Sequence, residues 1–246
     1  MPINFKVNQD KCIQCVKCID ICSPKYLQLV ENVVTIDKNK CIKCGHCFAV
    51  CPTAAISIFD IDPTIEKYAE DPVSKAIQMR HSIRSFKSEM LTNQELSEML
   101  QILKFAPSAR NARKTRYMVL TRPKLEQIIP IAGEALMDKY PNMKAMLQRS
   151  ADPIFRGAPH LIVAVEAGQV SVDGVIALSE FEILAASKGF GTCQCDFFIN
   201  ASNNQQIREA IGLQDNETVI ACLTFGKFEA QFVRPVARQP LNIDIQ

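Results

Sequence analysis

Short alternating runs near the N-terminus give way to helical repeats further along the chain. Ile56-Ser57-Ile58 alternates apolar and polar residues, which predicts a short strand. Beyond residue 72 the spacing changes, and Val73, Ala76 and Ile77 fall three or four residues apart, on one face of a helix. We expect this helix to run into the segment Arg80–Arg84. The pattern therefore divides the chain into a small N-terminal part and a larger part with helical periodicity.

The larger part combines helices with apolar strands. Thr92-Asn93-Gln94-Glu95 has the sequence of a helix capping box, with Leu91 and Leu96 placed as its hydrophobic staple. Because helices outnumber strands and do not alternate with them regularly, we expect an α+β fold. The pattern predicts helices near 96–103, 123–130 and 134–148, a helix from its cap Asp173 to Ser187 that Gly189 stops, a shorter helix ending at Gly212, and strands at 117–120, 161–165 and 218–225.

Gly189-Phe190-Gly191 does not have the context of a dinucleotide-binding loop. It follows a predicted helix rather than a strand, and no third glycine stands three positions on. A P-loop is also absent from the sequence. Basic side chains would therefore have to hold any phosphate-bearing cofactor.

Length and composition fit two globular domains. The chain has 246 residues, of which 48% are hydrophobic and 22% are charged. Pro63 and Pro72 bracket an acidic stretch after the predicted strand, which is typical of a linker. We expect a domain at residues 1–60, a linker at 61–72 and a second domain at 73–246.

Charge does not point to nucleic acid. The net charge is +2, and residues 61–246 carry 21 basic and 21 acidic side chains, so no basic stripe stands out. No apolar run approaches the roughly 18 residues of a membrane span, and the N-terminus lacks a signal-peptide pattern. We expect a cytoplasmic protein that binds neither nucleic acid nor membrane.

Eight of the eleven cysteines form two copies of one spacing. Each cysteine of the second copy lies 29 residues after its counterpart, and Pro24 and Pro52 follow the two runs. Zinc sites use two Cys-x2-Cys pairs and leave the third and fourth cysteines without a role, and disulfides rarely join thiols two residues apart. The two runs are Cys12, Cys15, Cys18 and Cys22, and Cys41, Cys44, Cys47 and Cys51.

This spacing resembles that of a bacterial two-cluster ferredoxin. In that pattern three cysteines of one run hold a [4Fe–4S] cluster, and its fourth ligand comes from the other run. The resemblance implies two clusters close enough to exchange electrons. Their ligands would be Cys12, Cys15, Cys18 and Cys51 for one, and Cys41, Cys44, Cys47 and Cys22 for the other.

Five segments after residue 76 resemble the FMN-dependent nitroreductase family, in particular its members with a fused two-cluster ferredoxin domain. They occur in the family's order and approximate spacing and cover residues from about 77 to 241. The resemblance implies a nitroreductase-like FMN domain behind a small ferredoxin-like domain. The segments are Arg80–Phe86, Ala106–Asn111, Gly157–His160 with the strand that follows, Ala185–Cys193 and Arg238–Leu241.

The resemblance also assigns residues to FMN. Arg80 and Ser82 would serve the phosphate, and Arg84 would reach the ribityl chain or the pyrimidine edge of the flavin. His81 would make a backbone or phosphate-side contact. Arg238 adds a third guanidinium, a group suited to a dianionic phosphate.

Two further groups of residues would lie against the flavin ring. Pro107, Ser108, Ala109 and Asn111 would cover the flavin of the partner subunit, which implies a homodimer. The backbone around Gln194, Cys195, Asp196 and Phe197 would offer an amide hydrogen to flavin N5. The thiols of Cys193, Cys195 and Cys222 are expected to pack as small apolar groups. No side chain is expected to act as a general acid.

One segment departs from the family. Where family members continue with Gln-Pro-Trp, this chain has Arg113-Lys114-Thr115, and it contains no tryptophan. We hypothesise that this basic wall favours an anionic substrate or docks the ferredoxin domain.

These resemblances imply a ferredoxin-linked flavin oxidoreductase. Electrons would pass from the two clusters to FMN and on to a small oxidised acceptor of the nitroaromatic or quinone type. The donor would be an external ferredoxin or NAD(P)H. Two alternatives stay open: an electron-transfer module that serves a partner protein, and a dehalogenase or other reductase on the same fold.

Overall fold

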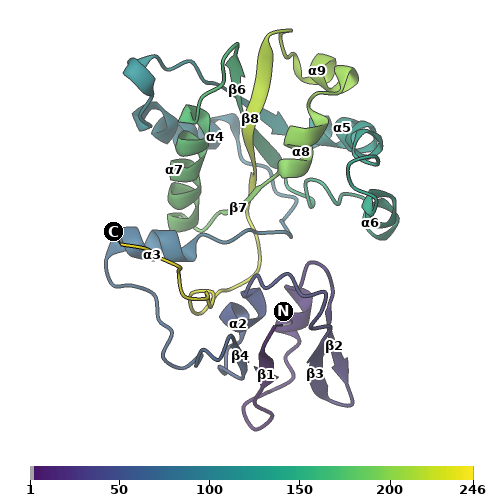
Figure 1. The fold of residues 1–246 in the computed structure, drawn as a ribbon, viewed down its shortest axis with the longest axis vertical. Helices are drawn as coiled ribbons and strands as arrows, with labels where there is room; N and C mark the ends of the chain where they lie inside the picture. The colour runs from purple at the N-terminus through teal and green to yellow at the C-terminus, as the bar shows by residue number, and fades with distance from the viewer. Residues whose placement is uncertain (1–2, 246) are drawn as a thin grey trace. The chain divides into compact units, whose positions relative to one another are not determined.

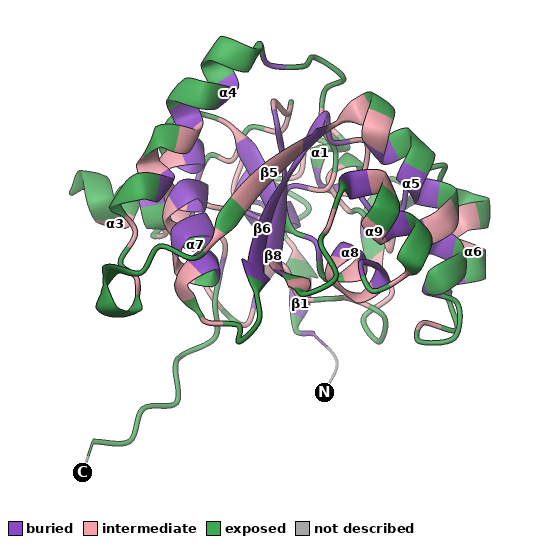
Figure 2. Cartoon of the chain, turned by 90° about the horizontal axis from the view of Figure 1, so that it is seen from above, coloured by how far each residue is buried: buried purple, intermediate pink, exposed green. Residues whose placement is uncertain are grey.

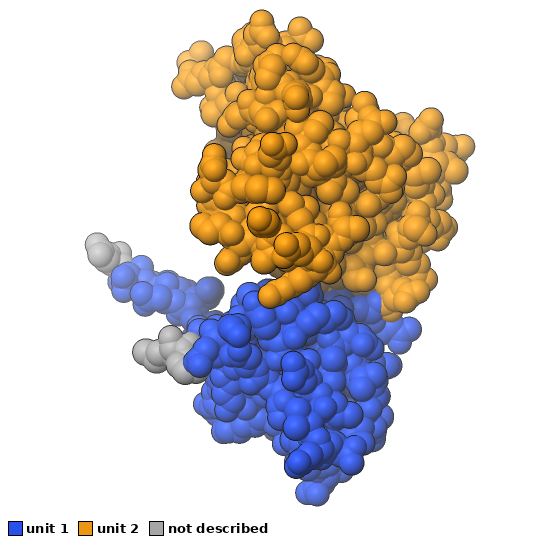
Figure 3. Space-filling view, turned by 90° about the vertical axis from the view of Figure 1, so that its right-hand side faces the viewer, with its two compact units in different colours: residues 1–79, 230–246 blue, residues 80–229 orange. Residues whose placement is uncertain are grey.

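The computed structural model describes residues 3–245, which form two compact units. Unit 1 comprises the residues up to Met79 together with those from Ala230 onward, and unit 2 is Arg80–Glu229 (Figure 3). These units differ from the domains expected from the sequence, because residues 61–79 and the C-terminal segment both belong to unit 1. Unit 1 is therefore built from two separate stretches of the chain.

The described residues of unit 1 form two small antiparallel sheets and three helices (Figure 1). The expected strand at residues 56–58 is confirmed, and it pairs with the strand nearest the N-terminus. The core centres on Phe48, which is fully buried and packs with apolar residues of both cysteine runs. The elements are β1 (Phe5–Val7), α1 (Lys17–Asp20), β2 (Leu27–Val30), β3 (Val33–Ile36), α2 (His46–Val50), β4 (Ile56–Ile58) and α3 (Pro72–Met79).

The expected continuation of α3 through Arg80–Arg84 is wrong. The helix ends at Met79, and the following segment is extended. Ser82 forms a parallel β-bridge with Thr192, and the amide nitrogen of Ile83 donates to the carbonyl oxygen of Thr192 at 2.8 Å. Pairing with a strand has replaced the helical hydrogen bonds that the local spacing suggested.

Unit 2 is built on a four-stranded antiparallel sheet in the order β5-β6-β8-β7. The strands are β5 (Arg116–Thr121), β6 (His160–Ala167), β7 (Gly191–Gln194) and β8 (Glu217–Gly226), so the three predicted strands are confirmed. In β6, Leu161 and Val163 face one apolar core, whereas Ile162 and Ala164 face a second one. Burial on both faces explains the uninterrupted apolar run of this strand.

Helices cover both faces of the sheet, as Figure 2 shows. One layer holds α4 (Asn93–Leu100) and α7 (Asp173–Ser187), and the other holds α5 (Arg122–Ala135), α6 (Met143–Arg149), α8 (Asp196–Ala201) and α9 (Gln205–Ile211). Short 3₁₀ turns occupy Gln101–Phe105 and Ala109–Asn111. Within residues 3–245 no helix is long and apolar enough to span a membrane.

Most helix boundaries follow their sequence signals. Thr92 and Glu95 form both hydrogen bonds of the capping box, and Gly189 follows α7 with a left-handed backbone. Asp173 is the first residue of α7 rather than its cap. The region expected as helices 123–130 and 134–148 is instead a longer α5, with Pro130 inside it, and a shorter α6.

Candidate cofactor sites

One cavity of unit 1 is lined by Cys12, Cys15, Cys18 and Cys51. The first three come from one cysteine run and the fourth from the other, so the fold brings together the four residues expected to hold one cluster. The amide nitrogen of Ala55 donates to the Cys51 sulfur at 3.3 Å. A thiolate accepts such a bond well, so this donor set fits an iron–sulfur cluster.

The backbone between the cysteines repeats with the same period as the sequence. Gln14 and Lys43 both have φ near +55°, as does Val16, whose counterpart Gly45 has φ +78°. A left-handed conformation costs a non-glycine residue about 1 kcal/mol or more, and such strain gathers at functional sites. Here it curls each Cys-x2-Cys loop, which lets successive thiols turn toward one centre.

Burial disfavours the free thiolate form of two cysteines in this unit. Burial and then the charges of Cys51 and Cys15 raise the pKa of Cys18 to about 11. Burial and the charges of Cys44, Cys18 and Cys41 raise the pKa of Cys47. Bound iron would place positive charge directly on the sulfurs, so the four-cysteine cavity fits a cluster better than free thiols.

The second cysteine set is less completely assembled by direct contacts. Cys47 interacts electrostatically with Cys41 and Cys44, and also with Cys18 of the first set. The Cys22 sulfur accepts from the amide nitrogen of Tyr26 at 3.4 Å. The role of Cys22 as the fourth ligand of this set stays a prediction.

Arg238 lies in unit 1, where its guanidinium donates to the carbonyl oxygen of Cys44 at 3.4 Å. The other residues expected to hold FMN lie in unit 2. Its expected contact with the FMN phosphate stays a prediction.

In unit 2, residues Arg80–Arg84 lie against β7. Ser82 and Ile83 pair with Thr192. The residues expected to bind the FMN phosphate therefore lie beside the strand that leads into Gln194–Phe197. Gly191 permits this approach, since an added Cβ would lie 2.8 Å from Cγ1 of Ile83. The structure thus brings two of the three expected flavin-contacting groups together. His81 is buried in this segment.

Glu182 is a residue of this site that the sequence interpretation missed. Its buried carboxylate accepts from the Thr192 hydroxyl at 3.1 Å and from the Gln194 amide at 3.5 Å. It also pairs with Arg80 at 3.7 Å. Burial raises the pKa of Glu182, while the positive charge of Arg80 opposes that shift. An acidic residue within an apolar helix was the available signal.

Arg156 was missed as well. It is half-buried with φ +60°, and burial lowers the pKa of its guanidinium, as does the positive charge of nearby Arg84. Both guanidinium groups interact electrostatically with the thiol of Cys193. Two arginines held near each other favour an anion between or beside them. Arg156 directly precedes Gly157–His160, one of the segments that resemble the nitroreductase family, and this position was the available signal.

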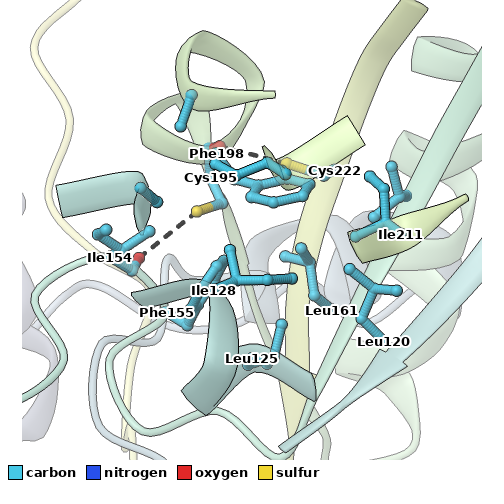
Figure 4. Close-up of a cluster of buried hydrophobic side chains, with 14 of the residues drawn as sticks. Leu120, Leu125, Ile128, Ile154, Phe155, Leu161, Cys195, Phe198, Ile211 and Cys222 are labelled. Atoms are coloured by element: carbon cyan, nitrogen blue, oxygen red, sulfur yellow. Dashed lines mark hydrogen bonds between the residues drawn. The ribbon is translucent and has the colours of Figure 1, made fainter. Parts of the chain in front are cut away.

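The thiols of unit 2 pack in the core, as expected. The Cys195 sulfur donates to the carbonyl oxygen of Ile154 at 3.4 Å, and the Cys222 sulfur donates to that of Cys195 at 3.2 Å (Figure 4). Burial raises the pKa of Cys193 and of Cys222. The Cys195 amide nitrogen also bonds within the protein, since it donates to the carbonyl oxygen of Cys222 at 3.1 Å. The expected amide hydrogen for flavin N5 from the backbone of Gln194–Phe197 stays a prediction. Phe197 packs edge-on against Tyr140.

The third expected group, Pro107–Asn111, attaches to the opposite end of α7. The amide nitrogen of Ala109 donates to Asp173 at 3.3 Å, nine residues before Glu182 and so about 13 Å away along the helix axis. Pro107, Ser108 and Arg113 instead line a separate cavity of about 310 Å³. Within one chain this group is thus not brought to the Arg80–Arg84 segment.

Comparison with known families finds two matches in the chain. Residues 77–227 match the nitroreductase family, and residues 11–62 match the 4Fe-4S dicluster domain. Comparison with curated protein sequences finds no match.

Solved structures of nitroreductases share the fold. An FMN-bound nitroreductase from Bacteroides fragilis is 18% identical with a TM-score of 0.63, covering 72% of this chain and 99% of its own. One from Desulfitobacterium hafniense, also with bound FMN, is 21% identical with a TM-score of 0.59, covering 70% and 96%. A nitroreductase family protein from Clostridium novyi is 26% identical with a TM-score of 0.50, covering 64% and 85%. With the nitroreductase model spanning more than half of its length, the chain belongs to the nitroreductase family, and it carries a 4Fe-4S dicluster domain at its N-terminal end.

Proposed function

We propose that this protein is a ferredoxin-linked FMN oxidoreductase. Electrons pass from two [4Fe–4S] clusters to FMN and on to a small oxidised acceptor of the nitroaromatic or quinone type. The observation that supports the proposal is the occurrence of two candidate cofactor sites in one chain. A four-cysteine cavity lies in unit 1, and a basic group beside β7 lies in unit 2, a unit whose fold is shared by FMN-bound nitroreductases.

FMN, when bound, links the one-electron chemistry of the clusters to the two-electron reduction of an organic acceptor. In this chain Arg80 and Ser82 bind its phosphate, and Arg84 holds the ribityl chain or the pyrimidine edge. Glu182 keeps Arg80 in place through their ion pair at 3.7 Å. Arg156 adds positive charge on the side of Arg84 and Cys193.

The active form is a homodimer in which Pro107–Asn111 covers the flavin of the partner subunit. This assignment is supported by the distance of about 13 Å along α7 that separates the contact points of the two groups within one chain. Residues from two chains would then complete each flavin site. Because its cluster thiols must stay reduced, we expect the protein in the cytoplasm.

The acceptor is an anionic molecule. Arg113 and Lys104 line the 310 Å³ cavity together with one carboxylate, that of Asp173, so the charged lining is positive on balance near the residues that would face the partner's flavin. The variant Arg113→Glu with Lys114→Glu should lower kcat/KM for an anionic nitroaromatic more than for a neutral one. Equal values for both substrates in the variant and the native protein would contradict this assignment.

Cofactor content is the first test of the proposed function. Protein purified without oxygen should contain eight iron, eight acid-labile sulfide and one FMN per chain, with the absorption spectra of both cofactor types. Zinc in place of iron, or a chain that binds no flavin, would overturn the proposal.

The FMN assignment is tested by charge removal. The variants Arg80→Gln and Arg84→Gln each lose charge-assisted hydrogen bonds, so each should weaken FMN binding about 10- to 100-fold. Arg149→Gln removes the same charge at an exposed residue of α6 and should bind FMN as the native protein does. An unchanged Kd for both site variants would remove these arginines from the site.

Direction and donor are tested by rapid mixing. Reduced ferredoxin and NAD(P)H are offered separately while cluster and flavin absorbance are followed. With reduced ferredoxin, the proposal expects the clusters to be reduced before the flavin, and then reoxidation by a nitroaromatic. NAD(P)H donates a hydride, so with this donor the flavin should be reduced first and the clusters after it. Cluster reduction with negligible turnover of small acceptors would instead favour an electron-transfer module. Release of halide from a halogenated substrate would favour the dehalogenase alternative.

A further inference from the structure

The last part of unit 1 is a C-terminal strap, residues 232–238, that lies along the segment Cys44–Cys51. The amide nitrogen of Val233 donates to the carbonyl oxygen of Ala49 at 2.9 Å. Ala237 is only 1% exposed and belongs to the core of the unit. At Gly45 an added Cβ would lie 3.2 Å from Cβ of Val236, so the two segments pack closely. The strap therefore touches the backbone that carries ligands of both expected clusters.

Arg234 brings a buried charge to this contact. Arg234 is only 7% exposed. Its Nη1 donates to the carbonyl oxygens of Phe48 and Cys51, each at 2.7 Å. Its guanidinium carbon lies 5.8 Å from the centroid of the Phe48 ring. Within residues 3–245 no carboxylate forms an ion pair with Arg234. A buried cation without an anionic partner is costly.

The four-cysteine cavity supplies the missing negative charge. Arg234 interacts electrostatically with Cys51, one of the four residues that line this cavity. A [4Fe–4S] cluster held by four thiolates is an anion, and one-electron reduction makes it more negative. A fixed cation in a buried setting stabilises the reduced form more than the oxidised form.

We propose that Arg234 is a positioning residue that raises the reduction potential of the cluster held by Cys12, Cys15, Cys18 and Cys51. The inference rests on the clusters of the proposed function and adds which of the two is tuned, and by which residue. With the charge of Arg234, that cluster is easier to reduce than the same cluster would be without it. The C-terminal strap thereby sets an electronic property of a site formed largely by the first 51 residues.

A purely structural role predicts something different. Arg234 also satisfies the carbonyl oxygens of Phe48 and Cys51, at the end of α2, and such a contact would stabilise the loop without changing a potential. Removing the charge separates the two roles. Arg234→Gln is neutral, whereas Arg234→Lys keeps the charge but loses the planar fork.

The test uses the holoprotein, purified without oxygen and checked for eight iron per chain. Each variant is titrated with dithionite while both cluster signals are followed by EPR. In Arg234→Gln the potential of one cluster should move to a more negative value, with a smaller shift of the other. Arg234→Lys should stay near the native potential. Lys6→Gln removes one charge at a lysine whose side chain is 65% exposed, and should shift neither.

The other possible results either support the proposal or overturn it. Unchanged potentials in an iron-replete Arg234→Gln protein would overturn the proposal. The variant Cys51→Ser, which should lack the tuned cluster, identifies the EPR signal of the other cluster. If Arg234→Gln shifted the potential of that other cluster alone, the proposal would also be wrong. If the neutral variant does not retain iron, Arg234→Lys decides. An iron-replete lysine variant supports a requirement for the charge, and an iron-poor one assigns Arg234 to structure alone. Because iron content is measured first, absence of clusters in the native protein is distinguished from absence of tuning.

Discussion

Single residues in unit 1 connect sequence spacing with cofactor chemistry. Cys51 stands beside Cys12, Cys15 and Cys18 although it is more than 30 residues away in the sequence. Crossed ligation predicts a different effect of cysteine variants from an arrangement in which each run holds its own cluster. A cluster should be lost with its true fourth ligand rather than with the last cysteine of its own run.

Cysteine-to-serine variants test this crossed ligation. Cys18→Ser and Cys51→Ser should remove the same cluster and leave identical EPR spectra of the other. Cys22→Ser should leave the complementary spectrum. If Cys18→Ser instead matched Cys22→Ser, each run would hold its own cluster and the crossed arrangement would be wrong.

The spacing of the cysteines was sufficient to predict this part of the site. It was predictable because cluster geometry constrains the local sequence directly. Glu182 and Arg156 were not predictable in the same way, since their roles arise from pairing of β7 with a segment about 110 residues earlier. No local spacing encodes such a contact.

His160 gives unit 2 a pH-dependent stability. His160 is fully buried, and this burial lowers the pKa of its imidazole. Its Nε2 accepts from the amide nitrogen of Leu91 at 2.9 Å. A histidine with a lowered folded-state pKa binds its proton more readily in the unfolded chain. Stability is therefore complete above the unfolded value of about 6.5 and is lost as the pH falls through the folded value.

This effect is measured by the temperature at which flavin fluorescence appears on heating. The native protein should melt at a lower temperature at pH 5 than at pH 7, and His160→Gln should lose less on the same acidification. Glutamine keeps an acceptor for Leu91 but does not titrate. Equal losses in the two proteins would show that other groups carry the acid sensitivity.

At the level of elements, the extended segment Arg80–Arg84 is the main difference from the sequence prediction. The residues have helical spacing, but Gly191 leaves space for a backbone to approach β7, and the hydrogen bonds to Thr192 replace those of a helix. Strand β7 itself was not predicted, because Gly-Thr-Cys-Gln has neither alternation nor a long apolar run. Helices with capping boxes and apolar faces were predicted because those signals are local.

The close approach at Gly191 predicts the effect of a single methyl group. Gly191→Ala would place a carbon 2.8 Å from Cγ1 of Ile83 and 2.9 Å from Cδ1 of Phe228, so the Arg80–Arg84 segment must move. FMN affinity should fall about tenfold or more, measured by fluorescence titration.

The matched control is Gly212→Ala at the end of α9. That glycine has φ +67° but open space around its Cα, so alanine there strains the backbone without displacing a neighbour. It should lower stability by about 1 kcal/mol and leave FMN affinity unchanged. Similar losses of affinity in both variants would point to general destabilisation.

For the whole molecule, the sequence indicated two domains but not their exact composition. Residues 230–238 contain one proline and two arginines without periodicity, which is typical of an exposed tail. Their packing in unit 1 depends on contacts with residues 186 and 194 positions earlier. Such distant packing was not predictable from the composition of the segment.

Substitution of Arg238 tests its expected contact with FMN. The family resemblance predicts that Arg238→Gln weakens FMN binding about tenfold, through loss of a charge-assisted contact to the phosphate. Iron content should stay at eight per chain, since its hydrogen bond to Cys44 is exposed and long. Loss of iron with unchanged FMN affinity would assign Arg238 to the cluster loop instead. Fluorescence titration and iron analysis on the same sample measure both.

The return of the strap to unit 1 also affects biosynthesis. The ribosome makes the cysteine runs first, then about 150 residues of unit 2, and only then the segment with Arg234 and Ala237. Cys51 and Arg234 are 183 residues apart, so at roughly 5–20 residues per second the interval between them lasts roughly 9–37 s. During this time the nascent cysteine loops lack the buried contacts that close their core. Cluster insertion into the growing chain would therefore meet an open loop, whereas insertion after release would meet a covered one.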